Sequence, residues 1–149
     1  MFVLITAAVT SQAYQLERLI GQSKDCIIFA DCYDLPAVLL KGKRFIKIPE
    51  GGTSSFAHIL LTTCLDLQIS KVFPLRKSEI SALAEARQIF DEYNIRVIVP
   101  SIEELKHYSD RGLTGDIIIK DKMEPDDDLP ARGVFLKNNH TNYQLFTAD

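Results

Sequence analysis

The stretch "LITAAVTSQAYQLERLI", residues 4–20, constrains the fold more than any other part of the chain. An apolar run passes through a loop of small residues into a segment in which Ala13, Leu16, Leu19 and Ile20 follow helical spacing. A strand, a short loop and an amphipathic helix in this order open the dinucleotide-binding folds. The loop contains no glycine, however, so side chains stand between its backbone and a pyrophosphate. We therefore expect a Rossmann-like opening that does not hold a dinucleotide.

Apolar runs and helical periods alternate over the first two thirds of the chain. The apolar runs, read as strands buried on both faces, are Phe2–Ile5, Cys26–Ala30, Val72–Phe73 and Ile95–Val99. Residues 44–48 alternate apolar and polar side chains, which is typical of an edge strand. Helical spacing recurs from Phe56 to Leu67 and from Ile80 to Phe90, and a capping box at Ser101 and Glu104 predicts a last helix. These patterns predict an α/β fold, a Rossmann-like three-layer arrangement around a five-stranded parallel sheet.

The remaining chain has no helical period. "GDIIIKDKM" and "ARGVFLKNNHTNYQLFTAD" are typical of strands, with a turn at Asn138–Asn139. We predict a Rossmann domain over residues 1–111 and a C-terminal β extension over residues 112–149. The extension would pack on the same domain or on a dimer mate, because exposed sheet edges invite pairing with the same chain or with a twofold mate.

Composition excludes several classes of partner. The 17 basic and 20 acidic residues give a net charge of −3, without the basic runs that nucleic acid requires. Three cysteines without metal spacing suit a reducing compartment. The apolar stretches are too short to span a membrane, and no export signal is present, so we expect a cytoplasmic protein.

Three segments in order resemble the N-terminal, pre-ATP-grasp domain of ATP-grasp enzymes such as biotin carboxylase and the carbamoyl phosphate synthase large subunit. They are "VLITAAVTSQAYQLERLI", "IIFADCYDLPAVLLKGKRFIKIPE" and "PLRKSEISALAEARQIFDEYNIRVIVPSIEELKHYSDR", covering residues 1 to about 111. The best individual matches are Ser78-Glu79, which opens a helix, and Asp110-Arg111 where the family has Asp-Lys. The opening loop departs from the family, which normally carries glycine there.

In that family, the lid and ATP-grasp domains that hold ATP and magnesium follow this point. Only residues 112–149 remain here, too few for two further α+β domains. The resemblance therefore implies a leading domain without its catalytic domains, and we expect no catalytic residue, cofactor or metal in this chain.

Right-handed crossovers place all strand-to-helix loops of such a sheet at one edge, where open α/β sheets bind ligands. The Thr6, Thr10 and Ser11 hydroxyls of the first loop could meet an anion at a helix N-terminus, or Thr10 or Ser11 could simply cap the helix. Asp31, at the end of the second strand, stands where dinucleotide folds hold a ribose hydroxyl, or is a solvated acidic residue.

Two more loops contribute candidates at this edge. Gly51 and Gly52 precede a helix and could wrap an anion, or form a plain connection. In "RKSE", residues 76–79, Arg76 and Lys77 could neutralise a phosphate or carboxylate, and Ser78 could cap the helix while donating to a ligand. By resemblance Glu79 matches an acidic position beside the family's substrate cleft, although acidic residues also complement a helix dipole.

Other polar residues do not form a recognisable centre. The three histidines are not spaced as metal ligands, and Asp126–Asp128 lacks the pattern of a calcium loop. Cys32 is a weak candidate nucleophile, because no histidine can be assigned as its base.

Three hypotheses follow. The first is a stand-alone, non-catalytic module that binds a small anionic ligand or a separately encoded ATP-grasp partner. The second is an enzyme, either one subunit of a split ATP-dependent carboxylate-amine ligase or carboxylase, or a degenerate nucleotide-binding Rossmann protein. The third is an assembly role for the C-terminal extension as the contact of a homodimer.

Overall fold

A parallel sheet forms the centre of the molecule. The computed structural model describes residues 2–21, 26–34, 44–108, 115–125, 129–137 and 143–149. The strands of this sheet are β1 (Phe2–Ile5), β2 (Cys26–Asp31), β3 (Arg44–Lys47), β4 (Ile69–Phe73) and β5 (Arg96–Val97). They are all parallel, in the order β3-β2-β1-β4-β5. The predicted α/β class and the position of residues 44–47 at a sheet edge are therefore confirmed.

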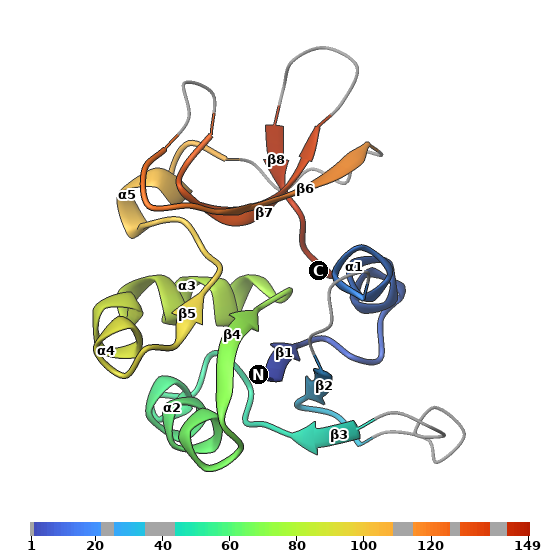
Figure 1. The fold of residues 1–149 in the computed structure, drawn as a ribbon, viewed down its shortest axis with the longest axis vertical. Helices are drawn as coiled ribbons and strands as arrows, with labels where there is room; N and C mark the ends of the chain where they lie inside the picture. The colour runs from blue at the N-terminus through green and yellow to red at the C-terminus, as the bar shows by residue number, and fades with distance from the viewer. Residues whose placement is uncertain (1, 22–25, 35–43, 109–114, 126–128, 138–142) are drawn as a thin grey trace.

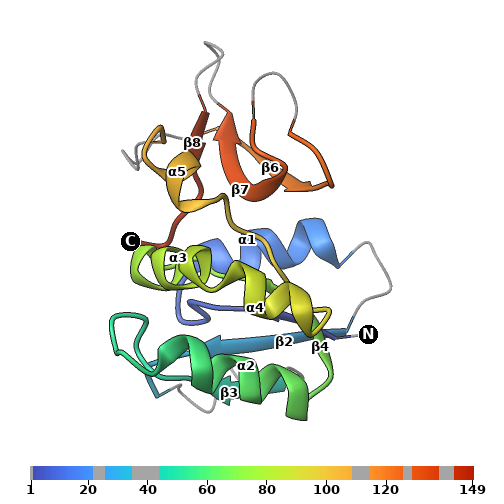
Figure 2. The same cartoon turned by 90° about the vertical axis from the view of Figure 1, so that its left-hand side faces the viewer.

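Helices cover both faces of this sheet (Figures 1 and 2). They are α1 (Ser11–Ile20), α2 (Phe56–Asp66), α3 (Lys77–Glu85) and α4 (Arg87–Glu92), whereas α5 (Ile102–Leu105) lies beside the C-terminal strands. The helix predicted from Ile80 to Phe90 is interrupted at Ala86, which separates α3 from α4. The predicted capping box is confirmed, because the Glu104 amide donates to Ser101 Oγ at 3.2 Å and the Ser101 amide donates to Glu104 Oε1 at 3.0 Å.

Side chains that alternate along the strands divide the core in two. Leu4 of β1 packs with Leu60 of α2, Leu83 of α3 and Phe90 of α4 on one face. On the opposite face, Val3 and Ile5 pack with Ala13 and Leu16 of α1. This burial of both strand faces explains why the strands are continuous apolar runs in the sequence.

The C-terminal residues form a second, antiparallel sheet. Its strands are β6 (Asp116–Asp121), β7 (Arg132–Lys137) and β8 (Tyr143–Leu145), in the order β6-β7-β8. Within the described residues this sheet does not extend the parallel sheet, so the expected pairing with a sheet edge of the same chain is wrong. Val134 and Phe146 pack instead into the core on the α1 side.

Some expectations about this region are not tested. The turn predicted at Asn138–Asn139 lies outside the described residues. The division of the chain at residues 111 and 112, and a homodimer through the extension, stay predictions.

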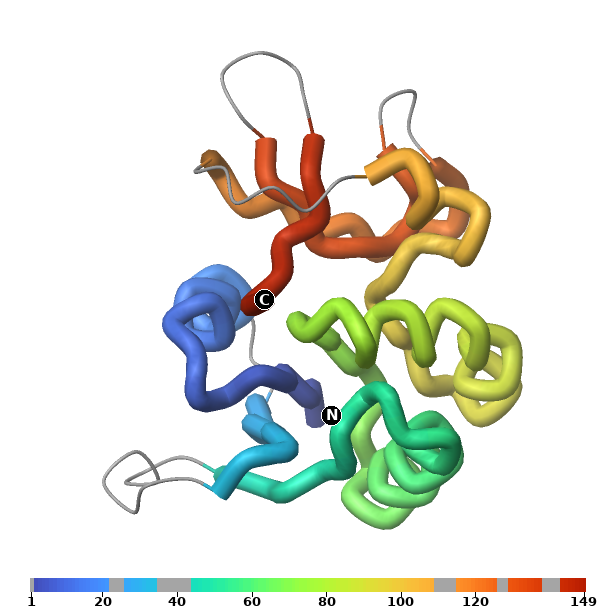
Figure 3. Tube along the Cα trace, turned by 180° about the vertical axis from the view of Figure 1, so that it is seen from behind, coloured from blue at the N-terminus to red at the C-terminus, as the bar shows by residue number. Residues whose placement is uncertain are grey.

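The chain then returns to the parallel sheet. The Phe146 amide donates to the Val134 carbonyl, and the Ala148 amide donates to the Leu75 carbonyl at 2.6 Å. The C-terminal residue thus lies beside α1 and α3 (Figure 3). The carboxyl edge of the sheet is therefore covered in part by the last residues of the chain.

None of the helices in the described ranges combines the length and apolar character needed to cross a membrane. The cysteines Cys26, Cys32 and Cys64 are all present as thiols.

Candidate functional site

The loop between β1 and α1 makes its tight turn without glycine. Ala7 takes a φ of 55°, a left-handed conformation that is costly for a residue with a Cβ. The turn is held by the Ala8 amide, which donates to the Ala30 carbonyl at 3.2 Å. Thr6 is fully buried, and its Oγ1 accepts a hydrogen bond from the Leu75 amide at 2.8 Å. Thr6 thus joins the loop after β1 to the loop after β4.

The other two hydroxyls of this loop lie at the start of α1. Thr10 is the N-cap residue, but its hydroxyl donates to the Ala7 carbonyl at 2.6 Å and does not accept from a helix amide. Ser11 is exposed and bonds to the side chain of Gln12 at 3.3 Å. Their role toward a ligand stays a prediction.

Asp31, which is buried, and Arg76, which is half-buried, form an ion pair at the carboxyl ends of β2 and β4. Arg76 Nη2 lies 3.0 Å from both Asp31 oxygens, and Arg76 Nε lies 3.2 Å from Oδ1. The Val9 and Cys32 amides donate to the same carboxylate at 3.0 and 2.8 Å. Asp31 is 0% exposed, so its interpretation as a solvated residue is wrong.

Arg76 is committed to this pair. Burial lowers the pKa of its guanidinium, but the hydrogen bonds and charge of Asp31 outweigh burial and leave the pKa raised. The guanidinium also stacks on Tyr33, 5.1 Å from the ring centroid. Arg76 is therefore not an open cation for a free anion, because its planar fork already holds a carboxylate.

Glu79 is the second buried carboxyl group at this edge. It lies in the first turn of α3 and is 0% exposed. Among the described residues neither carboxyl oxygen has a hydrogen-bond partner. Burial raises its pKa to about 7, against the opposing effects of the neighbouring Thr6 hydroxyl and Arg76. Near neutral pH the proton on Glu79 can therefore be gained or lost.

A carboxylate already occupies the N-terminus of α3. The Lys77 amide donates to Asp149 Oδ1 at 2.9 Å, across 72 residues of sequence. Residues 76–79 thus contribute to this edge in three ways. Arg76 pairs with Asp31, the Lys77 amide donates to Asp149, and Glu79 is a buried carboxyl group.

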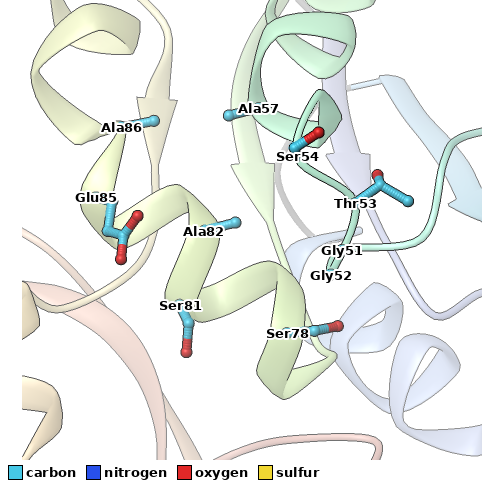
Figure 4. Close-up of a pocket in the computed structure, with 10 residues that line it drawn as sticks. All are labelled: Gly51, Gly52, Thr53, Ser54, Ala57, Ser78, Ser81, Ala82, Glu85 and Ala86. Carbon is cyan, nitrogen blue, oxygen red and sulfur yellow. The ribbon is translucent and has the colours of Figure 1, made fainter.

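A cavity of about 520 Å³ opens beside the same helix (Figure 4). The described residues that line it are Gly51, Gly52, Thr53, Ser54, Ala57, Ser78, Ser81, Ala82, Glu85 and Ala86. The loop after β3 thus faces α3, and the predicted site residues Gly51, Gly52 and Ser78 lie together.

Gly51 allows the loop after β3 to approach α3 more closely than a residue with a side chain could. A Cβ at this position would lie 2.6 Å from the Glu79 amide nitrogen, 2.7 Å from Ser78 Oγ and 2.8 Å from Glu79 Cγ. A Cβ on Gly52 would meet nothing within 4 Å. The packing of this loop against α3 therefore needs a glycine at position 51. At position 52 there is open space for a side chain.

Sequence reasoning missed two residues of the site. Asp149 lies far along the chain in a strand-like tail, so no local pattern relates it to α3. Glu85 lies six residues after Glu79 on α3, a spacing that does not place two carboxylates on one face of a helix, so no sequence pattern pointed to it.

The remaining candidates form no further centre. Burial and the Asp31 charge raise the pKa of the Cys32 thiol, which disfavours a thiolate nucleophile. No group of three or more His, Cys, Asp or Glu side chains within the described ranges is arranged to hold a metal ion. Asp126–Asp128 lies outside those ranges.

The fold and the edge define a Rossmann-like α/β protein with a small antiparallel sheet. No protein-family model and no curated protein matches the chain. Among solved structures, MoeE5 in complex with UDP-glucose and NAD is similar at 23% identity and a TM-score of 0.42, over 87% of this chain. MoeE5 in complex with UDP-glucuronic acid and NAD gives 21% identity and a TM-score of 0.39.

The chain spans 42% of the length of MoeE5 in both complexes. Likeness at this level carries no inference about what this chain binds. The resemblance to pre-ATP-grasp domains also stays a prediction, although its Ser78-Glu79 pair does lie in the first turn of a helix. The matching Asp110-Arg111 pair lies outside the described residues.

Proposed function

We propose that this chain is a pre-ATP-grasp-like module that binds a small anionic ligand at the carboxyl edge of its parallel sheet. It is not catalytic by itself. The observation that carries this proposal is the Asp149 carboxylate on the Lys77 amide, 2.9 Å away. A carboxylate of the chain itself stands in for the anionic group of a ligand.

The surroundings of this position favour negative charge. Lys77 begins α3, so its amide has no acceptor within the helix and lies at the positive end of the helix dipole, where it donates to Asp149. The Lys77 side chain is exposed on the same turn. A carboxylate, phosphate or bicarbonate could replace Asp149 with the same hydrogen bond.

The pairing of two charged groups at this edge supports the proposal that the chain is not catalytic by itself. Asp31 accepts hydrogen bonds from Arg76 and from two backbone amides, so the charges of Asp31 and Arg76 are already paired. Of the candidates in the described residues, Glu79 alone combines burial with unpaired polar atoms. We place the protein in the cytoplasm, a location supported by its free thiols.

Binding is tested by the thermal stability of the full chain with phosphate, bicarbonate, ATP, ADP, NAD and biotin. A ligand at a hundred times its dissociation constant adds about 2.7 kcal/mol, which raises the midpoint by several degrees for a chain of this size. We expect a rise with phosphate or bicarbonate and a larger rise for Asp149→Ala. No shift with any anion, or ATP-dependent turnover by the chain alone, would refute the proposal.

A second candidate function is a subunit of a split ATP-grasp ligase, and Glu79 favours it. A buried carboxyl group that titrates near neutral pH is typical of acid or base catalysis, and a partner could supply the ATP site. The test is to mix the chain with an ATP-grasp protein that lacks its own leading domain. ATP turnover that requires both chains and is lost in Glu79→Gln would support this function, and unchanged turnover would contradict it.

A further inference from the structure

The cavity between the loop at residues 51–54 and α3 differs in chemistry from the anion position at the Lys77 amide. Neither Arg76 nor Lys77 is among its lining residues. Its polar groups are the hydroxyls of Thr53, Ser54, Ser78 and Ser81 together with the Glu85 carboxylate. Among the lining residues that the structure describes, Glu85 is the one that carries a charge, and that charge is negative.

The shape of the cavity leaves room for a small molecule. Ala82 and Ala86 of α3 face Ala57 and Ser54 across it (Figure 4). Their short side chains, and the absence of a side chain on Gly52, leave the space between the two walls unfilled. A volume of about 520 Å³ lies within the range of small-molecule sites.

The buried Glu79 places a second carboxyl group of α3 next to this cavity. Gly51 and Ser78 both line the cavity, and the space where Gly51 would carry a Cβ lies 2.8 Å from Glu79 Cγ. Both oxygens of Glu79 lack a hydrogen-bond partner among the described residues. The Glu85 carboxylate at the opening thus biases the local potential toward cations, and Glu79 behind the wall adds to this bias when it is ionised.

We propose that this cavity is a second ligand site, selective for a small molecule with hydroxyl groups and a protonated amine. The hydroxyls of the wall exchange hydrogen bonds with hydroxyls of the ligand. Glu85 pairs with the ammonium group at the opening, and its negative charge disfavours an anionic competitor. The site is independent of the anion position, because it does not use the Lys77 amide or Asp149.

The test is a set of three ligands that share a three-carbon skeleton and differ in charge. The probes are serinol, which carries an ammonium group, neutral glycerol, and anionic glycerate, each titrated into the full chain while backbone amide NMR signals are followed. We expect the affinity order serinol, glycerol, glycerate, with shifts at residues 51–54 and 78–86. Equal or tighter binding of glycerate, shifts confined to other residues, or no shift with serinol would overturn the proposal.

Two variants test whether Glu85 causes the preference for a positively charged ligand. Glu85→Gln removes the exposed carboxylate and should weaken serinol about two- to fivefold, with little effect on glycerol. Glu92→Gln is the matched control, because Glu92 is an exposed carboxylate on α4 outside the cavity. An equal effect of both variants would refute the role of Glu85.

Filling the cavity gives a second readout. Gly52→Leu places a side chain where a Cβ meets nothing within 4 Å, so the fold should tolerate it and the affinity for serinol and glycerol should fall. Phosphate shifts at the Lys77 amide should persist in this variant. Undiminished serinol binding would contradict the assignment, whatever the outcome for phosphate.

Discussion

Asp31 and Glu79 lie at the same edge of the same sheet, and both are 0% exposed, yet their surroundings differ. Asp31 accepts hydrogen bonds from the Val9 and Cys32 amides and from the Arg76 guanidinium. Neither oxygen of Glu79 has a partner among the described residues. Burial alone therefore does not distinguish the two groups, whereas hydrogen bonding does.

The comparison separates a structural carboxylate from a candidate functional one. A buried ion pair that is fully hydrogen-bonded holds its neighbours in one arrangement, here the loops after β1, β2 and β4. A buried carboxyl group without partners lowers stability when ionised, and such groups cluster at sites with a role. Four substitutions test this difference between Asp31 and Glu79.

The largest effect is expected from Arg76→Met, which leaves Asp31 buried without its cation. Removing one partner of a buried pair typically costs 3–5 kcal/mol, so we expect a loss of about 3 kcal/mol in the free energy of unfolding. Urea denaturation measures it. The control is Lys77→Met, an exposed neighbour that should change stability by less than about 0.5 kcal/mol. Similar values for the two variants would show that the pair is not structural.

For Glu79 the expected effect depends on pH. The pKa of about 7 is above the usual value of 4.5, so the folded state binds the proton more tightly than the unfolded state. The stability from this group is full below pH 4.5 and is lost as pH rises through 7, by about 3 kcal/mol at most. Glu79→Gln should flatten this slope between pH 4.5 and 8. Denaturation curves with the same slope for both proteins would contradict the account of Glu79.

Gly51→Ala tests the close contact that covers Glu79. The added Cβ would lie 2.6 Å from a backbone nitrogen, so α3 or the loop must shift, at a cost of about 1–3 kcal/mol. Gly52→Ala is the matched control in the adjacent position and should cost less than about 1 kcal/mol. Equal midpoints of thermal unfolding for the two alanine variants would show that the contact is not tight.

The smallest effect is expected at Asp149. Asp149→Ala removes an exposed carboxylate from the start of α3, which should cost about 0.5–1 kcal/mol, as loss of a helix cap does. Asp149→Asn keeps a side-chain oxygen for the Lys77 amide and should lose less. If alanine and asparagine variants have the same stability as the unchanged protein, the contact does not contribute to folding.

Much of the fold could be predicted from local patterns. Continuous apolar runs such as Cys26–Ala30 identified buried strands, and alternation at residues 44–48 identified the edge strand, because each pattern follows directly from which faces are covered. The break at Ala86 was not predictable from spacing, since apolar residues continue in helical register across it.

The site was predicted less completely, because its contacts join distant parts of the chain. The position of Asp31, Arg76 and Glu79 at one edge follows from right-handed topology. That Arg76 holds Asp31 rather than a ligand depends on side-chain geometry across 45 residues. The contact of Asp149 with α3 spans 72 residues and depends on how the antiparallel sheet directs the tail.

We propose the start of α3 as an anion site that Asp149 now occupies. The most direct measurement is a phosphate titration followed at the Lys77 amide signal, in the unchanged protein and in Asp149→Ala. We expect a saturable shift of that amide signal in both proteins. Phosphate should bind more tightly to Asp149→Ala, because the competing Asp149 carboxylate is removed. An amide signal that does not respond to phosphate in Asp149→Ala would contradict the claim.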